Sequence, residues 1–314
     1  MGKISKEDIC FIRPKIDAND YYFRGIERMG YKILVPYKGN GLVLRVMREA
    51  WFRFGLPNVR TWYNDELNKI DPKVFIVRDS LITNEFLMWL REHHPKARII
   101  MDYDNLASTT LDPDSIQDKT VEKWSYDADD CKRYGMKMKP LSFLDVYRVS
   151  EKETPEYDVL YLGRDKGRLG YLLDLEEQIR QQGLRPYFHI CADRRFQRFK
   201  NRHYKGLMTY ESYIGLMKKS RAILNVVTKP QKSMTMRDME VLFNGIKGIT
   251  NNSSAVDFPL YDPSRFFVVG VDDMDSLPAF LETPFRPVDE KELDLFKYEK
   301  AIDQMVNGNE DNRV

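Results

Sequence analysis

The stretch that decides the fold is PQKSMTMRDME at residues 230–240, followed by VLFNGIKGITNN at residues 241–252. An apolar run at 222–227 precedes it and stops before Pro230, which predicts a strand, a loop, a helix and a second strand. Ser233 or Thr235 can cap this helix, because a hydroxyl oxygen accepts a hydrogen bond from an unpaired backbone N–H.

The predicted helix has one polar face, on which Arg237, Glu240 and Asn244 recur at i, i+3 and i+7. A helix N-terminus at the end of a parallel strand favours an anion, because its N–H groups and dipole both point there. We therefore expect Ser233, Thr235 and Arg237 to bind a phosphate, and Glu240 to accept hydrogen bonds from a ribose diol. The alternative is an ordinary helix whose Arg237 and Glu240 form a solvated pair. The opposite face would pack against a sheet through Met239, Leu242, Phe243 and Ile246.

This segment resembles the nucleotide-sugar segment of GT-B glycosyltransferases, and in particular bacterial capsule and lipopolysaccharide enzymes related to the CgeB-like group. The resemblance rests on Gln231, Thr235, Arg237 and Glu240, followed by GITNN at 248–252. It implies that Glu240 binds the ribose hydroxyls. It also implies that the loop before the helix faces the diphosphate and the donor sugar, which places Gln231 and Lys232 at the sugar.

The composition indicates a globular protein of two domains. A chain of 314 residues is too long for one ordinary core and fits two domains of about 150 residues each. Hydrophobic residues make up 42% and charged residues 31%, which is not the composition of a disordered or membrane-spanning chain. The chain shows no long apolar run and no signal-peptide core, so we expect it in the cytoplasm.

The cysteines and histidines give no sign of a metal site. Cys10, Cys131 and Cys191 form no C-x-x-C pair, so we expect reduced packing residues. The four histidines lack the spacing of metal ligands. We expect neither a metal nor a cofactor.

Charge is unevenly distributed along the chain. Residues 161–240 carry 17 Lys and Arg against 8 Asp and Glu, a net charge of +9, whereas residues 271–314 carry 5 against 12, a net charge of −7. A local basic excess around a phosphate loop suits an anionic ligand. The basic and aromatic run at 194–205 also fits nucleic acid, but it looks isolated and we interpret it as a surface loop, so we expect no nucleic-acid partner.

The first half opens as a Rossmann-like domain. Its pattern predicts a strand at 9–12, a loop, a helix ending near Met29 and a second strand at 31–36, without a G-x-G-x-x-G motif. Asp17 and Asp20 lie in the loop after the first strand, where a general base for an acceptor hydroxyl commonly sits in this fold. Either aspartate can instead cap the following helix.

Two further segments of the first half have two interpretations each. Residues 42–54 form an aromatic and basic amphipathic helix, which can lie on an anionic membrane surface or bury Trp51 and Phe52 in the core. Asp102 and Asp104 follow a strand as an acidic D-x-D pair. This pair is a metal and nucleotide signature in a different glycosyltransferase fold, GT-A, and we favour ordinary residues at a strand end.

The second half begins after a polar linker at 148–156. A strand at 157–162 leads into a loop with Arg164, Lys166 and Arg168 between two glycines, and then into a helix. The resemblance implies that Arg164 and Lys166, and less clearly Arg168, hold the donor diphosphate as it departs. The alternative is a surface turn of solvated charges.

Two residues are candidates for binding the nucleotide base. His189 ends a predicted strand and could approach the base or ribose, although a packed histidine fits the same pattern. Tyr210 begins a Tyr-x-x-Tyr helix, and the resemblance places that helix beside the base.

Together these patterns predict an α/β protein with the GT-B fold, in which two Rossmann-like domains with parallel sheets face each other across a cleft. We expect an acceptor domain at 1–150, a nucleotide-sugar domain at 156–288, a helix at 289–306 that packs back on the first domain, and a disordered tail at 307–314. The expected activity is metal-independent sugar transfer from a nucleotide-sugar to a glycan or lipid-linked acceptor. An accessory subunit of another transferase and a nucleotide-sugar epimerase are the alternatives. The patterns do not distinguish inversion from retention, and they do not predict the oligomeric state.

Overall fold

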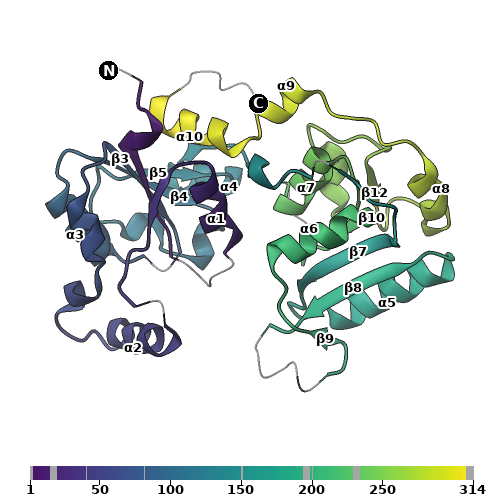
Figure 1. Ribbon diagram of the computed structural model, residues 1–314, viewed down its shortest axis with the longest axis horizontal. Coiled ribbons are helices and arrows are strands. Elements are labelled where there is room, and N and C mark those ends of the chain that lie inside the picture. Colours follow the sequence, from purple (N-terminus) through teal and green to yellow (C-terminus); the bar gives the residue numbers. More distant parts are fainter. Residues whose placement is uncertain are drawn as a thin grey trace. The chain divides into compact units, whose positions relative to one another are not determined.

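The computed structural model describes residues 3–14, 20–39, 41–80, 82–149, 151–193, 199, 201–228 and 234–308. The chain divides into two compact units: unit 1 comprises Met1–Pro140 and Tyr298–Val314, and unit 2 comprises Leu141–Lys297. Within the described residues, each unit contains a parallel six-stranded sheet with helices packed on it (Figure 1). The prediction of two Rossmann-like domains is confirmed.

The sheet of unit 1 has its topological switch point beside its first strand. Strand β1 pairs in parallel with β2 on one side and β3 on the other, with Cys10 opposite Lys32 and Phe75. The core of this unit includes Phe75 and Met101, which are fully buried. The strand order is β2 (Lys32–Leu34), β1 (Ile9–Ile12), β3 (Val74–Arg78), β4 (Arg98–Tyr103), β5 (Glu122–Ser125) and β6 (Lys137–Met138).

Helix α10 belongs to unit 1, although it comes last in the chain. Arg98 of β4 donates hydrogen bonds to the carbonyls of Met305 at 3.1 Å and Val306 at 2.5 Å. Tyr298 at the start of the helix is buried and reaches Asp102 at 3.5 Å. The helices of this unit are α1 (Tyr21–Arg28), α2 (Leu42–Arg53), α3 (Asn84–His93), α4 (Ala128–Tyr134) and α10 (Tyr298–Asn307).

The sheet of unit 2 reverses its strand order at β7, which lies between β8 and β10. Its order is β12 (Phe266–Val268), β11 (Lys247–Thr250), β10 (Ser220–Asn225), β7 (Tyr157–Arg164), β8 (Pro186–Cys191) and β9 (Tyr204–Lys205). The helices are α5 (Leu169–Gln181), α6 (Tyr210–Lys218), α7 (Met236–Asn244), α8 (Leu277–Glu282) and α9 (Glu290–Asp294).

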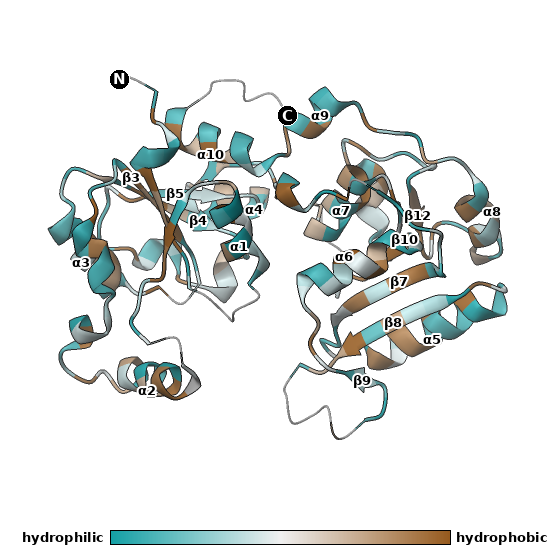
Figure 2. Cartoon of the chain, viewed as in Figure 1, coloured by the Kyte–Doolittle hydropathy of each residue, from teal (hydrophilic) through white to brown (hydrophobic). Residues whose placement is uncertain are grey.

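Helix α5 shows how the hydrophobic pattern builds this unit. Leu172, Leu175 and Ile179 recur every three or four residues and are buried. Hydrophobic and hydrophilic residues alternate along the helix, as expected for a helix with one covered face (Figure 2). Among the described residues, no helix combines the length and the hydrophobicity needed to cross a membrane.

The division between the units differs from the predicted boundary near residue 150. Residues 141–149 belong to unit 2, because Phe143 stacks on Phe243 with ring centroids 4.6 Å apart and the Arg148 guanidinium binds the Phe243 carbonyl at 2.9 Å. The segment 289–297, which contains α9, also belongs to unit 2, where Arg148 pairs with Glu290. Polar composition at 151–156 therefore marks a surface stretch and not the boundary. Most of the predicted tail, residues 309–314, lies outside the described residues.

Gly248 of β11 allows this strand to pack closely. A Cβ atom at this position would lie 2.8 Å from the side chains of both Phe266 and Val241. We expect Gly248→Ala to lower the unfolding free energy of unit 2 by about 1–3 kcal/mol, because the added methyl group overpacks a filled core. Chemical denaturation measures the effect. Gly170→Ala is the matched control, since no atom beyond its chain neighbours and the backbone of its own helix lies within 4 Å of its Cβ position, and equal stability of both variants would contradict the packing argument.

Candidate functional site

The candidate site lies at the carboxyl edge of the unit 2 sheet, at its switch point between β7 and β10. In open α/β sheets, ligands bind at this edge because neighbouring connections leave in opposite directions and open a crevice. Strand β7 extends to Arg164, two residues beyond the predicted end, so the loop after it is 165–168, and helix α7 follows the connection after β10. The sequence segments that suggested phosphate binding thus reach the same edge of one sheet.

Thr235 caps helix α7. Its hydroxyl oxygen accepts hydrogen bonds from the backbone N–H of Arg237 at 3.2 Å and of Asp238 at 3.4 Å. Asp238 completes a capping box by accepting from the Thr235 N–H at 2.7 Å, and the Asn225 amide of β10 binds both side chains. The expectation that Ser233 or Thr235 caps this helix is met by Thr235. The predicted site residues Gln231, Lys232 and Ser233 lie outside the described residues.

Four side chains from α6 and α7 form a hydrogen-bonded group, which we call the Glu240 cluster: Tyr210, Tyr213, Arg237 and Glu240. The hydroxyl of Tyr210 donates to Glu240 Oε1 at 3.0 Å. The hydroxyl of Tyr213 and the guanidinium of Arg237 both donate to Glu240 Oε2, at 2.8 and 2.7 Å. The i, i+3 spacing of Arg237 and Glu240 thus forms an ion pair, and two tyrosines of a neighbouring helix hold the carboxylate in place.

Burial separates this pair from a solvated surface pair. Glu240 is 4% exposed, and Arg237 lies over the Tyr213 ring at 4.4 Å while donating to the Leu162 carbonyl of β7 at 3.0 Å. Burial raises the pKa of Tyr213 well above its usual value. Burial alone would lower the pKa of Arg237, but the neighbouring charge of Glu240 raises it, so the guanidinium stays charged.

The Glu240 cluster leaves a defined acceptor position. Each carboxylate oxygen accepts about two hydrogen bonds, and from the described residues Oε1 accepts only the one from Tyr210. The Tyr210 ring packs edge-to-face against the Tyr147 ring, with centroids 5.0 Å apart. This contact orients the Tyr210 hydroxyl.

The three cations at the end of β7 and in the loop after it have different partners. The Arg164 guanidinium donates to the carbonyls of Ala192 and Asp193, and Arg168 donates to the carbonyl of Val226, which follows β10. Arg168 therefore ties the two sides of the switch point together. Lys166 is exposed and has a positive φ of 49°, a conformation that its backbone N–H stabilises by binding Asp193 Oδ1 at 3.1 Å. Its ammonium group is the best placed of the three to reach an anion.

The contacts of His189 do not involve the residues of the Glu240 cluster. It is buried in β8, and its Nε2 lies 2.6 Å from the Gly206 carbonyl next to β9. Burial lowers its pKa, so the ring is neutral at neutral pH. These contacts fit the packed-histidine interpretation that the sequence left open.

Of the two candidate bases in unit 1, Asp20 is described and Asp17 is not. Asp20 is 8% exposed and caps helix α1 by accepting from the Phe23 N–H at 3.1 Å. Its carboxylate therefore has the capping role that the sequence offered as the alternative.

Tyr213 and Asn251 are site residues that sequence reasoning did not select. Tyr213 follows Tyr210 at i+3 and so shares its helix face, a spacing that could have identified it. Asn251 binds both the N–H and the carbonyl of Val227, at 2.7 and 3.1 Å, and holds the start of the connection that leads to α7. Its role depends on a register between β10 and β11 that the sequence pattern does not give.

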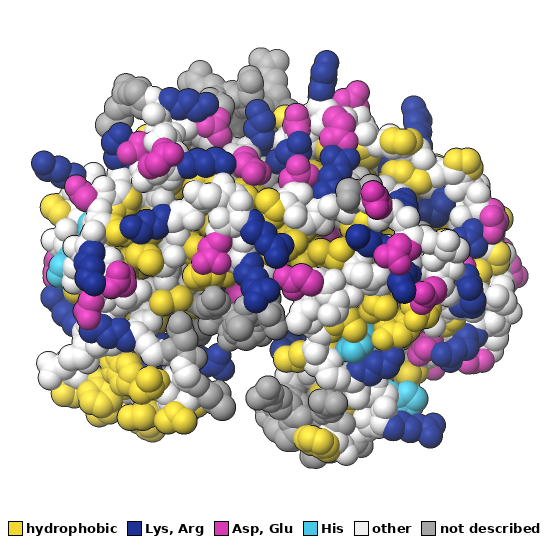
Figure 3. All heavy atoms as spheres, viewed as in Figure 1, with side chains coloured by type: hydrophobic (Ala, Val, Ile, Leu, Met, Phe, Trp, Pro, Cys, Tyr) yellow, Lys and Arg dark blue, Asp and Glu magenta, His cyan; other side chains and the backbone are white. Residues whose placement is uncertain are grey.

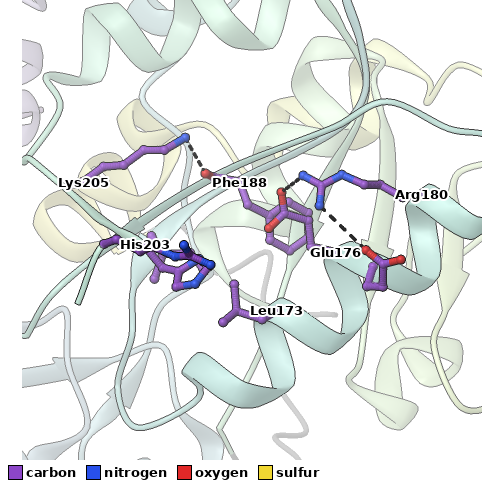
Figure 4. Close-up of a pocket in the computed structure, with 9 residues that line it drawn as sticks. Leu173, Glu176, Arg180, Phe188, His203 and Lys205 are labelled. Atoms are coloured by element: carbon purple, nitrogen blue, oxygen red, sulfur yellow. Dashed lines mark hydrogen bonds and ion pairs between the residues drawn. The ribbon is translucent and has the colours of Figure 1, made fainter.

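A pocket of about 390 Å³ lies between α5 and the β8–β9 edge, apart from all the predicted site residues. Figure 4 shows the Lys205 ammonium turned to the Phe188 carbonyl, at 2.7 Å, and Arg180 paired with Glu176 at 2.5 Å. These charged groups already have partners. The pocket is lined by Leu173, Glu176, Glu177, Arg180, Phe188, Ile190, Arg202, His203 and Lys205.

Unit 1 has a buried ionic network at the carboxyl edge of its own sheet. The Lys139 ammonium binds Asp102 and also Asp104, the latter at 3.1 Å, and Arg13 binds Asp104 at 2.8 Å. Burial alone would lower the pKa of Lys139, but the charges of Asp102 and Asp104 raise it. Arg78 lies 3.7 Å from Asp104 as well, so cations of its own unit already bind the D-x-D pair.

Comparisons with known proteins return similar solved structures at low sequence identity. A lipopolysaccharide outer core galactosyltransferase, WaaB, in its apo form is 14% identical, with a TM-score of 0.48 over 94% of this chain and 98% of that chain. A Listeria monocytogenes protein assigned as a UDP-N-acetylglucosamine 2-epimerase is 8% identical, with a TM-score of 0.43 over 96% and 91%. The spinosyn forosaminyltransferase SpnP is 13% identical, with a TM-score of 0.42 over 96% and 98%.

No protein-family model and no curated protein sequence matches the chain. The three solved structures include two transferases and one epimerase, and all three TM-scores are below 0.5. These similarities do not decide between transfer and epimerisation.

Proposed function

We propose that the protein is a glycosyltransferase of the GT-B kind that moves a sugar from a nucleotide-sugar to a hydroxyl acceptor. The observation that carries the proposal is the Glu240 cluster at the switch-point edge of unit 2. A buried carboxylate, oriented by Tyr210, Tyr213 and Arg237, suits the diol of a ribose, one hydroxyl of which would donate to the remaining acceptor position on Oε1. The resemblance of the 231–252 segment to GT-B enzymes of the CgeB-like group supports the same role.

The donor would lie along the edge from the Glu240 cluster to the loop after β7. Tyr210 is proposed to flank the base, while Gln231 and Lys232 would contact the sugar. Lys166, with Arg164 beside it, would offset the charge of the leaving diphosphate, together with the N-terminus of α7 near Thr235. Cations of the protein can supply this stabilisation, so the proposed reaction needs no metal.

The reaction forms one bond and breaks one bond. The acceptor oxygen attacks the anomeric carbon, the bond from this carbon to the diphosphate oxygen breaks, and the nucleoside diphosphate leaves. A base accepts the acceptor proton. We assign this role to Asp17, with Asp20 as the second candidate, since the Asp20 carboxylate also caps α1.

The proposed acceptor is a growing surface polysaccharide or a lipid-linked glycan, such as those of capsule or lipopolysaccharide synthesis. We place the protein in the cytoplasm, in peripheral contact with the inner face of the membrane. The +9 net charge of residues 161–240 supports an anionic donor in unit 2.

Thermal stabilisation by nucleoside diphosphates tests the donor site. We expect one of UDP, GDP, CDP and dTDP to raise the melting temperature of the wild type. Lys166→Ala should weaken the binding of that nucleotide about tenfold or more, because a charge-assisted contact to phosphate is lost. Lys291→Ala, another exposed lysine of unit 2, serves as control and should bind as the wild type does.

If no nucleotide stabilises the wild type, the transferase proposal fails and an accessory subunit becomes the better interpretation. Mass spectrometry of the donor after incubation distinguishes a transferase from the remaining alternative, an epimerase. An epimerase yields a product isomeric with the nucleotide-sugar and needs no acceptor, whereas a transferase releases the nucleoside diphosphate.

A further inference from the structure

Helix α2 of unit 1 presents hydrophobic side chains to solvent. Val43 is 71% exposed, Val46 56% and Met47 49%, and Phe54 directly after the helix is 74% exposed. Val43, Met47 and Phe54 are spaced by four and seven residues, so they share one side of the helix. We call Val43, Leu44, Val46, Met47 and Phe54 the α2 apolar face.

The side of α2 that faces unit 1 carries a buried cation. Arg48 is 8% exposed, lies over the Tyr37 ring at 4.8 Å and donates to the Lys38 carbonyl at 3.3 Å. Phe52 packs on the same Tyr37 ring, with centroids 5.3 Å apart. An ordinary surface helix directs its apolar stripe to the core and its charges to water. In α2, Phe52 does face the core and Glu49 and Arg53 face water, but large apolar residues also remain outside.

The α2 apolar face forms a continuous hydrophobic patch. Figure 3 shows hydrophobic side chains gathered over α2, at the lower left of the view. Monomeric soluble proteins seldom leave a contiguous apolar patch of this kind uncovered without a binding function. Trp51 lies at its border, with its indole N–H bound to the Pro57 carbonyl at 2.8 Å, and half-buried tryptophans of this kind are common at membrane interfaces.

The charge around the α2 apolar face is positive. Residues 38–60 contain five Lys and Arg and a single acidic residue, Glu49. Arg53 is exposed and forms no ion pair within the described residues, whereas the exposed Lys38 and Arg60 pair with Asp65 at 2.7 Å and Glu92 at 2.8 Å. An apolar face with an exposed cation beside it matches a bilayer surface, which offers hydrocarbon beneath anionic headgroups.

We propose that α2 docks unit 1 on an anionic lipid surface by inserting Val43, Met47 and Phe54 below the headgroups. Arg53 then contacts the lipid phosphates. This inference gives the proposed membrane contact a defined surface, and it does not rest on the glycosyltransferase proposal. It holds for any activity that the protein has.

Vesicle sedimentation with the full chain tests this docking. Wild type is expected to sediment with vesicles of phosphatidylcholine containing about a third phosphatidylglycerol, and much less with phosphatidylcholine alone. The triple variant Val43→Gln, Met47→Gln, Phe54→Gln should lower the partition coefficient on the order of a hundredfold, because three large apolar side chains no longer leave water. A control variant, Leu207→Gln with Val271→Gln, changes residues 63% and 58% exposed in unit 2 and should bind as wild type does.

Three results would overturn the proposal. The first is wild type that stays in the supernatant with anionic vesicles. The second is equal sedimentation of the wild type and the triple variant, with circular dichroism showing that both are folded. The third comes from light scattering without lipid: a wild-type dimer that the triple variant converts to a monomer would make the face a contact between two copies. Equal binding to neutral and anionic vesicles would contradict the proposed preference for an anionic lipid surface.

Discussion

A Lys139→Ala variant is expected to lose about 3–5 kcal/mol of the unfolding free energy of unit 1, because it leaves buried carboxylates without their cation. The Lys139 side chain is 6% exposed, and it separates Asp102, which is 2% exposed, from Asp104, which is 11% exposed. Without the ammonium group, two aspartates repel each other in a region of low dielectric constant, and the remaining cations, Arg13 and Arg78, both face Asp104 and not Asp102. Differential scanning calorimetry should show the transition of unit 1 at a lower temperature.

Lys137→Ala is the matched control for this prediction. Lys137 is two residues earlier and pairs with Glu122 at 3.0 Å, but its side chain is 59% exposed. Solvated pairs of this kind contribute about 0–1 kcal/mol, so the control should unfold close to wild type. A Lys139→Ala loss as small as that of Lys137→Ala would show that water reaches the network and replaces the ammonium.

Glu240→Ala is expected to have an effect of similar size on unit 2, again about 3–5 kcal/mol. The variant leaves the Arg237 guanidinium, whose side chain is 23% exposed, without its counter-ion, and the hydroxyls of Tyr210 and Tyr213 lose their acceptor. Glu240→Gln should cost less, since the amide oxygen can still accept from Tyr213 and Arg237 at the Oε2 position, while the amide NH2 can donate to the Tyr210 hydroxyl oxygen. Calorimetry of the unit 2 transition measures both variants.

Helix α5 offers the control for the Arg237–Glu240 ion pair. Glu177 and Arg180 have the same i, i+3 spacing as the two charged residues of α7, but they are 58% and 53% exposed and 3.9 Å apart. Glu177→Ala should therefore change stability by less than about 1 kcal/mol. If Glu240→Gln keeps the stability of the wild type yet loses the thermal response to nucleotide, the ligand role of the carboxylate is separated from its structural role. An unchanged response in that variant would contradict the ribose assignment.

The sequence was sufficient to predict the order and faces of local elements in unit 2. Alternating strands and helices predict parallel sheets, and the spacing of Arg237 and Glu240 placed them correctly on one face of α7. The same spacing did not reveal their burial. That depends on α6, whose tyrosines reach the carboxylate from 27 and 30 residues away in sequence.

Helix α2 shows a different limit of sequence reasoning. Its helical period is clear from residues 42–54, but a period does not say which side faces the protein. The side is set by Tyr37, whose ring receives both Arg48 and Phe52. Similarly, no local pattern links Arg98 to the carbonyl of Val306, 208 residues later.

That last contact has a consequence for the order in which the protein is made. Unit 2 is one continuous stretch of chain, whereas unit 1 waits for α10, which the ribosome adds after all of unit 2. Domains commonly fold during synthesis from the N-terminal side, at about 5–20 residues per second. Here unit 2 can finish first, while the surface of unit 1 that α10 covers stays open for roughly ten to thirty seconds. During this interval, the nascent unit 1 is the part of the chain that most needs a chaperone.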